Sequence, residues 1–108
     1  MSHITISEFE KLDIRVGKVL EAERVPGSRK LMKLIVDVGG ERRQLIAGIA
    51  GHYDPNSLKG REVVVLVNLK PKRIMGLESQ GMILAADVEG GPVLLTVDRE
   101  VPPGTKVR

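Results

Sequence analysis

The stretch LMKLIVDVGGERRQLIAGIA, Leu31 to Ala50, sets the fold class of this chain. Its two apolar segments flank Gly39-Gly40-Glu41, and such a glycine pair supplies the positive φ angles of a tight hairpin. The first segment alternates between two faces with the period of a half-buried strand: Leu34, Val36 and Val38 against Lys33, Ile35 and Asp37. We therefore expect an antiparallel hairpin with one buried and one partly charged face.

Further short strands are predicted on both sides of this hairpin. They are rich in β-branched or apolar residues and cover Ile14–Val25, Arg61–Leu69, Met82–Val88 and Val93–Asp98. The first ends at Pro26-Gly27, as a strand ends at a turn, and Gly90-Gly91 predicts a hairpin between the last two. Five consecutive apolar residues in the second indicate a buried central strand.

The segments between the strands predict little helix. Ser7 followed by Glu10 has the spacing of a capping box, which predicts one helical turn near the N-terminus. Asp54 followed by Pro55 predicts a second short helix. Lys70–Gln80 is too irregular for a strand and long for a turn, and loops of this length tend to be functional.

Six or so short strands with glycine hairpins predict an all-β fold, in which a closed barrel removes exposed strand edges. Periodicity alone does not separate an OB-fold from an SH3-like barrel. The short helix between the third and fourth strands favours the OB order. We expect one domain over residues 1–108, a five-stranded OB-fold barrel with an N-terminal helical turn and a C-terminal strand extension.

Composition narrows the class of protein. The 108 residues contain no cysteine, which fits a reducing compartment, and no apolar run approaches the roughly 18 residues of a membrane span. We expect a soluble, cytoplasmic protein. The net charge of +3 is unevenly distributed, because Ala22–Met75 carries +6 while both flanking segments are negative. Such a concentration of positive charge favours a polyanionic partner.

Enzymatic and metal sites find little support in the residues. His52, Asp54 and Ser79 have the residue types of a nucleophilic triad, but Ser79 lies in no G-x-S-x-G elbow. His3 and His52 are far apart, and without cysteine they make a zinc site improbable. Neither a phosphate-binding loop nor a dinucleotide fingerprint is present. We expect a non-catalytic protein without a cofactor.

Four ordered segments carry a resemblance to a known family. They are FEKLDIRVGKV (9–19), KLMKLIVDVG (30–39), IAGIAGHYDPNSLKGR (46–61) and NLKPKRIMGLESQGMILAA (68–86). Together they resemble the tRNA-binding domain family, whose members include the C-terminal domain or β-subunit of methionyl-tRNA synthetases, free-standing tRNA-binding proteins and CsaA-like proteins. The loop Val25–Leu31 departs from the family pattern, since Arg29 makes it more basic.

The resemblance implies an OB-fold that binds tRNA by shape and phosphate backbone. It places contacts on residues of two regions: Lys30, Lys33, Lys70, Lys72, Arg73, Ser79 and Met82. It also implies a homodimer that uses the C-terminal extension, and the catalytic part of a methionyl-tRNA synthetase as a possible partner. The alternative function is a CsaA-like peptide-binding chaperone or a protein-interaction module of a synthetase complex.

The residue chemistry agrees with RNA binding. Lys70, Lys72 and Arg73 lie close together in sequence, and Arg42 adds charge on the predicted hairpin, as phosphate binding requires. Phe9 and Tyr53 are the only aromatic residues, too few for a base-stacking platform, which favours folded RNA over single strands.

Three other polar or soft residues of this region have two interpretations each. Ser79 can donate to a phosphate or a 2′-hydroxyl, and Asn68 and Gln80 can read a base edge or bind the protein backbone. For Asn68 we favour the structural role. Met82 can contact a splayed base, although a methionine at a strand start is more often part of a core.

Overall fold

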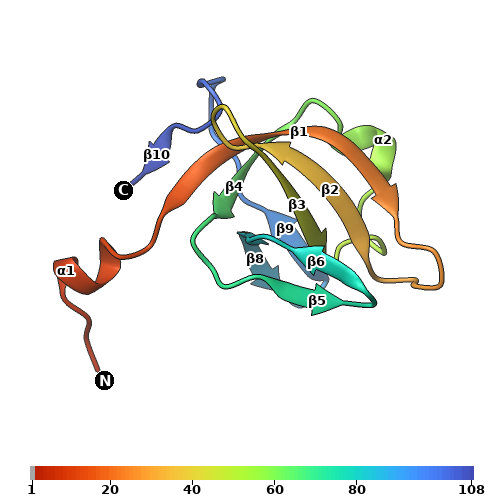
Figure 1. The fold of residues 1–108 in the computed structure, drawn as a ribbon, viewed down its shortest axis with the longest axis horizontal. Helices are drawn as coiled ribbons and strands as arrows, with labels where there is room; N and C mark the ends of the chain where they lie inside the picture. Colours follow the sequence, from red (N-terminus) through yellow and green to blue (C-terminus); the bar gives the residue numbers. More distant parts are fainter. Residues whose placement is uncertain (1) are drawn as a thin grey trace.

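The computed structural model describes residues 2–108, in which antiparallel strands form a nearly closed barrel (Figure 1). The main sheet has the order β3-β2-β1-β4-β7, and β10 pairs with β1 beside it. The strands are β1 Ile14–Arg24, β2 Met32–Asp37, β3 Arg42–Ala47, β4 Glu62–Leu66, β7 Met82–Ile83 and β10 Lys106–Val107. The predicted all-β barrel of OB type, with its C-terminal strand extension, is confirmed.

The long strand β1 bends across the barrel and joins three partners. Its first half pairs with β4 and its second half with β2, and the β1–β2 register shifts between Val19 and Glu21. Gly17 permits the close approach at the bend, because a Cβ there would lie 2.5 Å from Cγ1 of Val36. A bulge and a glycine together give this strand the curvature that a small barrel needs.

The barrel closes between β3 and the end of β6 (Leu77–Ser79) largely through side chains. The backbone N–H of Ile46 donates to Oγ of Ser79 at 3.0 Å, and that of Gln44 donates to Oε1 of Gln80 at 3.0 Å. The N–H of Gln80 donates to the carbonyl of Gln44 at 2.8 Å. We call these four residues the closing seam, since they satisfy backbone groups that a sheet edge would leave unpaired.

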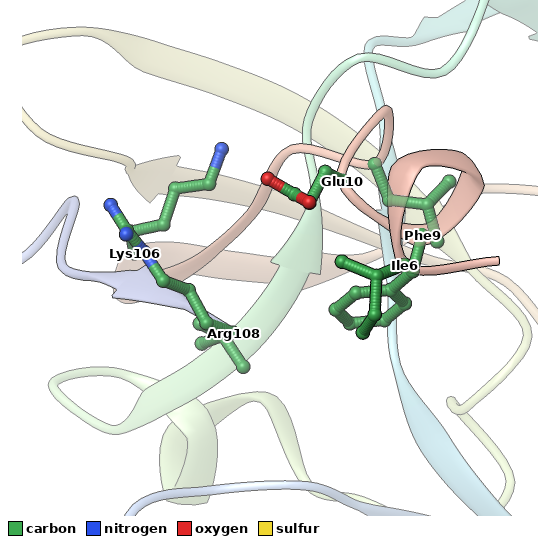
Figure 2. Close-up of a pocket in the computed structure, with 7 residues that line it drawn as sticks. Ile6, Phe9, Glu10, Lys106 and Arg108 are labelled. Carbon is green, nitrogen blue, oxygen red and sulfur yellow. The ribbon is translucent and has the colours of Figure 1, made fainter.

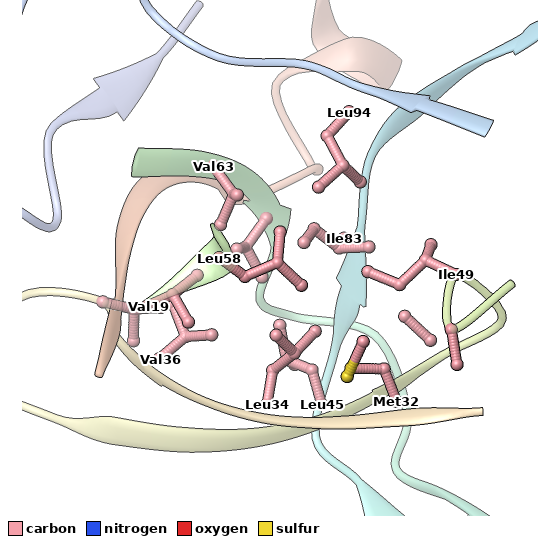
Figure 3. Close-up of a cluster of buried hydrophobic side chains, with 14 of the residues drawn as sticks. Val19, Met32, Leu34, Val36, Leu45, Ile49, Leu58, Val63, Ile83 and Leu94 are labelled. Carbon is pink, nitrogen blue, oxygen red and sulfur yellow. The ribbon is translucent and has the colours of Figure 1, made fainter. Parts of the chain in front are cut away.

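The core fills the barrel interior with side chains of alternate strand positions (Figure 3). On β2 the predicted face is buried and the opposite face is partly exposed. The most deeply buried residues come from three strands and one helix: Met32, Leu34, Val36, Leu45, Leu58, Val63 and Val65. Leu58 belongs to α2 (Pro55–Leu58), which begins as predicted, with the Asp54 carboxylate accepting from the N–H of Asn56 at 2.9 Å.

The N-terminal helix α1 (Ile6–Phe9) lies apart from the barrel, and its predicted start was wrong (Figure 1). The capping box uses Thr5 and Glu8 instead of Ser7 and Glu10: Oγ1 of Thr5 accepts from the N–H of Glu8, and the Glu8 carboxylate accepts from the N–H of Thr5. Both pairs have the same spacing in sequence. The chain must be extended by Ile14 to enter β1, so the earlier pair leaves room for the connection.

The segment 70–80 was expected to be irregular, but it contains a second hairpin. Strands β5 (Lys72–Ile74) and β6 pair antiparallel around the turn Met75-Gly76. Both turn residues have positive φ, 51° and 79°, as in the two-residue turns that match the twist of a hairpin. Because methionine is not a usual turn residue, the sequence pattern did not indicate this hairpin.

The predicted strand Met82–Val88 is divided in the structure. Its first part is β7, and its second part is β8 (Ala85–Val88), which pairs with β9 (Gly91–Leu94) in a separate hairpin as the glycine pair predicted. Leu84 lies at the break, where its N–H donates to the carbonyl of Val64 and its own carbonyl accepts from Leu95. The single strand predicted for Met82–Val88 therefore corresponds to two strands that belong to different sheets.

Candidate nucleic-acid interface

The β5–β6 hairpin and the residues directly before it carry the three basic residues that the sequence singled out. Lys70, Lys72 and Arg73 are all exposed. In the hairpin register Lys72 lies opposite Ser79, and Arg73 lies opposite Glu78. Because neighbouring strand residues point to opposite faces, Lys72 and Arg73 lie on different faces of the hairpin. A polyanion that binds both must therefore reach around the hairpin or over its tip.

The tip of this hairpin reaches the loop between β1 and β2 (Figure 1). A Cβ placed on Gly27 would lie 3.8 Å from Cε of Met75, so the thioether methyl lies beside that loop. The loop is held by Ser28, whose Oγ accepts from the N–H groups of Lys30 and Leu31. The hairpin and the loop thus form one continuous region of surface.

Exposed basic residues of these two neighbouring segments make up what we call the basic surface: Arg29, Lys30, Lys70, Lys72 and Arg73. Four of the five were predicted contacts. Arg73 is partly held in place, since its Nη1 donates to the carbonyl of Gly76 at 2.9 Å. The two loops are far apart in sequence, and the fold brings their charges together.

Ser79 was predicted to contact RNA, but the structure buries it. Only 5% of the residue is exposed, and its hydroxyl both accepts from Ile46 and donates to the carbonyl of Gly81 at 3.1 Å. This side chain is part of the closing seam, where it occupies the place of a missing strand partner. Its physical role in the structure is to close the barrel, and we leave it out of the candidate interface.

Two amides near the hairpin also bind the protein's own backbone. Oδ1 of Asn68 accepts from the N–H of Asp13 at 2.8 Å, and its Nδ2 donates to the carbonyl of Lys11 at 2.6 Å. This confirms the structural role favoured for Asn68. Gln80 binds within the closing seam in the same way. Both side chains use their polarity inside the fold.

Lys33 and Arg42 lie on the outer face of the sheet, where acidic residues accompany them. Nζ of Lys33 is 2.8 Å from a carboxylate oxygen of Glu23, and Arg42 lies opposite Asp37 in the β2–β3 register. Arg42 is at the far end of the hairpin from Lys30, roughly 20 Å away at strand rise. Along the β2–β3 hairpin Arg42 is therefore distant from Lys30.

Arg43, next to Arg42, has a structural role. Its Nη1 donates to the carbonyls of Val67 at 2.8 Å and Gln80 at 3.1 Å, and its Nε lies 3.1 Å from the Glu41 carboxylate. The guanidinium thus ties β3 to the end of β4 beside the closing seam. Adjacent arginines in the sequence gave no sign that one of them binds inside the protein.

Among the residues that the structure describes, two methionines are exposed, and one of these was predicted to be a contact. Met82 is 47% exposed at the start of β7, so it does not belong to the core. Met75 is 59% exposed at the tip of the hairpin, and the sequence analysis did not single it out. A signal was present, since Met-Gly between Ile74 and Leu77 is a possible two-residue turn, but methionine is not typical of one.

A groove of about 370 Å³ lies away from the basic surface, between α1 and β10 (Figure 2). Apolar side chains of Ile6, Phe9, Leu12 and Val107 line it, with charged residues at its margin. Ile4, Ile6 and Leu12 are exposed in the chain as it stands. Such a patch on a small protein marks a surface suited to another apolar surface.

Beside this groove an ion pair joins β1 to β10. Nη2 of Arg15 lies 2.8 Å from Oδ2 of Asp13, and Nζ of Lys106 lies 3.4 Å from Oδ1. The hydrogen bond from Arg15 is the main cause that lowers the pKa of Asp13 below its ordinary value. The same bond raises the pKa of Arg15. These charges stabilise the terminal strand pairing.

The residues considered for a triad are not arranged as one. The Asp54 carboxylate caps α2, and the Ser79 hydroxyl belongs to the closing seam. The His52 ring packs over Gly91, where an added Cβ would lie 2.3 Å from Cε1. Within residues 2–108 no group of three or more His, Cys, Asp or Glu side chains is placed to hold a metal ion. In the same range no helix has the length and apolarity to cross a membrane.

An OB-type barrel with basic residues on two adjacent loops is the architecture of a nucleic-acid-binding module. Residues 14–106 match the family profile described as "Putative tRNA binding domain". The chain belongs to this tRNA-binding domain family, as the four sequence segments predicted.

Individual relatives agree with this assignment. The methionine–tRNA ligase of Archaeoglobus fulgidus is 59% identical over 104 residues, which are 96% of this chain and 16% of that protein. The solved MetRS related protein from Pyrococcus horikoshii has a TM-score of 0.94 and 43% identity, covering 100% of both chains. The chaperone CsaA from Bacillus anthracis has a TM-score of 0.89 and 34% identity, covering 99% of this chain and 100% of that one.

Proposed function

We propose that this chain binds tRNA through the basic surface, by its phosphates and shape. The observation that carries the proposal is the contact between the β5–β6 hairpin and the β1–β2 loop, because it joins five exposed basic residues into one region. Family membership supports the class of ligand. Phosphate contacts by lysine and arginine release counterions from the nucleic acid and so provide most of the affinity.

The aromatic residues support recognition of folded RNA over base stacking. Phe9 lines the groove beside α1, away from the hairpin. The Tyr53 hydroxyl accepts from the N–H of Leu94 at 3.0 Å, and Arg61 lies over its ring at 5.8 Å from the centroid. Both rings therefore have places in the protein's own structure. Recognition of folded RNA through phosphates and 2′-hydroxyls needs no aromatic platform.

We infer that the whole of residues 1–108 acts as one non-catalytic binding unit in the cytoplasm. The chain spans 16% of the length of a methionine–tRNA ligase relative, while it covers 100% of a solved MetRS related protein. It serves either as the tRNA-binding part of a methionyl-tRNA synthetase, with the catalytic part as partner, or as a free-standing protein. Both arrangements use the same surface.

We also propose a homodimer formed through the groove between α1 and β10. Ile6 is 73% exposed and Ile4 is 67% exposed. Burial of these apolar side chains against a second copy would remove them from water, which is favourable. Lys106 and Arg108 also line this groove, and both are exposed (Figure 2). In this proposed dimer the C-terminal strand extension contributes to the interface.

The test of the proposed function compares tRNA with an unfolded polypeptide as ligands. Binding of each is measured at low salt by fluorescence anisotropy, with the same protein preparation. The proposal expects tight binding of several different tRNAs and weak binding of the polypeptide. Absence of tRNA binding together with tight polypeptide binding would replace it with the CsaA-like function.

A further inference from the structure

The turn residue Met75 has a backbone conformation that its side chain does not favour. Met75 and Gly76 both have positive φ, and turns of this kind prefer Asn-Gly or Asp-Gly. Among the described residues other than glycine, Met75 is the one with positive φ. A residue with an ordinary side chain pays roughly 1–2 kcal/mol for this region of backbone space. Asparagine would remove much of that cost.

The side chain of Met75 is also exposed in a way that burial does not explain. It is 59% exposed, and a Cβ placed on Gly27 would lie 3.8 Å from its methyl group. A structural role would bury the thioether in a core, as for Met32, which is 0% exposed. Backbone strain and apolar exposure at one surface position together point to a role in binding.

The position of Met75 places it in the middle of the basic surface. Lys72 and Arg73 lie on opposite faces of the hairpin, and Met75 lies at the tip between them. Lys30 belongs to the loop that its methyl group approaches. If these charges hold RNA phosphates on both sides of the tip, the nucleotide between those phosphates would lie over the thioether.

We propose that Met75 contacts the face of an unstacked base, and that the basic surface therefore prefers folded RNA with an exposed nucleotide to a continuous duplex. This inference rests on the proposed function and narrows its ligand. A thioether is polarizable and makes favourable contacts with aromatic rings, among which nucleobases count. A continuous duplex keeps its bases stacked and offers phosphates and ribose alone.

The test uses Met75→Asn, which keeps the turn and removes the apolar side chain. Its affinity for tRNA should fall about fivefold, the factor that a typical sulfur–ring contact represents. Its affinity for a blunt RNA duplex should not change, and its melting temperature should equal or exceed that of the unmodified protein. Met75→Leu, which keeps an apolar side chain, should lose less tRNA affinity than Met75→Asn. Val88→Asn is the matched control, because it also replaces an exposed apolar side chain by asparagine, on β8.

Three results would overturn the inference. One is equal tRNA affinity of Met75→Asn and the unmodified protein. Another is an equal loss on tRNA and duplex, which would assign the effect to a displaced hairpin. The third is unchanged affinity of Met75→Gly, a second variant that tolerates the same φ if the asparagine variant folds poorly. If the unmodified protein does not bind tRNA at all, the proposed function fails first, and the two failures are thus distinguished.

Discussion

The hydroxyl of Ser79 accepts a hydrogen bond from the backbone N–H of Ile46 at 3.0 Å, and this bond helps to close the barrel between β6 and β3. Replacement by alanine leaves a buried N–H without a partner, which costs about 1–3 kcal/mol. We therefore expect Ser79→Ala to lower the free energy of unfolding by that amount in a urea titration. Ser57→Ala, at an exposed serine in α2, is the matched control and should have a much smaller effect.

A result with Ser79→Ala fully stable and tRNA binding lost would contradict this account. Such a result would restore Ser79 as an RNA contact. Because Ser79 is buried, Ser79→Ala can weaken tRNA binding only by displacing the β5–β6 hairpin. The loss of tRNA affinity should therefore diminish at lower temperature, where the variant is well folded.

Asn68 connects the end of the barrel to the segment after α1. Asn68→Ala removes the acceptor for Asp13 and the donor for Lys11, so the free energy of unfolding should fall by about 1–2 kcal/mol. Asn68→Asp keeps the acceptor and loses the donor, so its free energy of unfolding should lie between those of Asn68→Ala and the unmodified protein. Hydrogen exchange at the Asp13 amide provides the local measurement. Equal protection in all three proteins would show that these bonds do not hold the segment.

The ion pair of Asp13 with Arg15 makes stability depend on pH. The folded state lowers the pKa of Asp13 from its ordinary 3.8, so the unfolded state binds a proton more readily. The stabilisation is therefore fully present above pH 3.8 and is lost as the pH falls through the lowered folded-state value. Asp13→Asn removes it at every pH. The stability difference between the two proteins should be seen at neutral pH and shrink in acid, and a constant difference would argue against the ion pair.

The proposed dimer depends on the apolar groove beside α1. Ile6→Glu places a charge in that groove, so sedimentation at several concentrations should show a monomer where the unmodified protein is a dimer. Val88→Glu adds the same charge to another exposed apolar position and should leave the dimer intact. A monomeric unmodified protein, or dissociation by both variants alike, would exclude this interface.

The sequence predicted those features that local chemistry determines. Gly39-Gly40 both have positive φ, and Asp54 caps α2, because these effects involve only neighbours in the chain. Met75-Gly76 has the same kind of turn as a glycine pair, but no local preference of methionine indicates it. The structural roles of Ser79 and Arg43 could not be read from the sequence for a different reason. Their partners lie 33 and 24 residues away, at Ile46 and Val67, and only the closed barrel creates the buried backbone groups that they satisfy.

The candidate site likewise has one part that the sequence indicates and another part that depends on the fold. Lys70, Lys72 and Arg73 could be identified from their density of charge in a short segment. Their joining with Arg29 and Lys30 depends on how β1 bends and where the hairpin tip lies. The charge pattern thus indicated one segment of the candidate surface, while the other segment could be added only from the fold.

The salt dependence of tRNA binding tests the central claim most directly. The unmodified protein is compared with Lys70→Ala/Lys72→Ala/Arg73→Ala, and with Lys18→Ala/Lys59→Ala/Arg99→Ala as a control that removes equal charge elsewhere. The first variant should bind all tRNAs more weakly, and its slope of log K against log salt should be shallower by about 3, near one for each lost phosphate contact. The control should keep a slope near that of the unmodified protein. An unchanged slope in the folded first variant would contradict the claim that this hairpin binds tRNA phosphates.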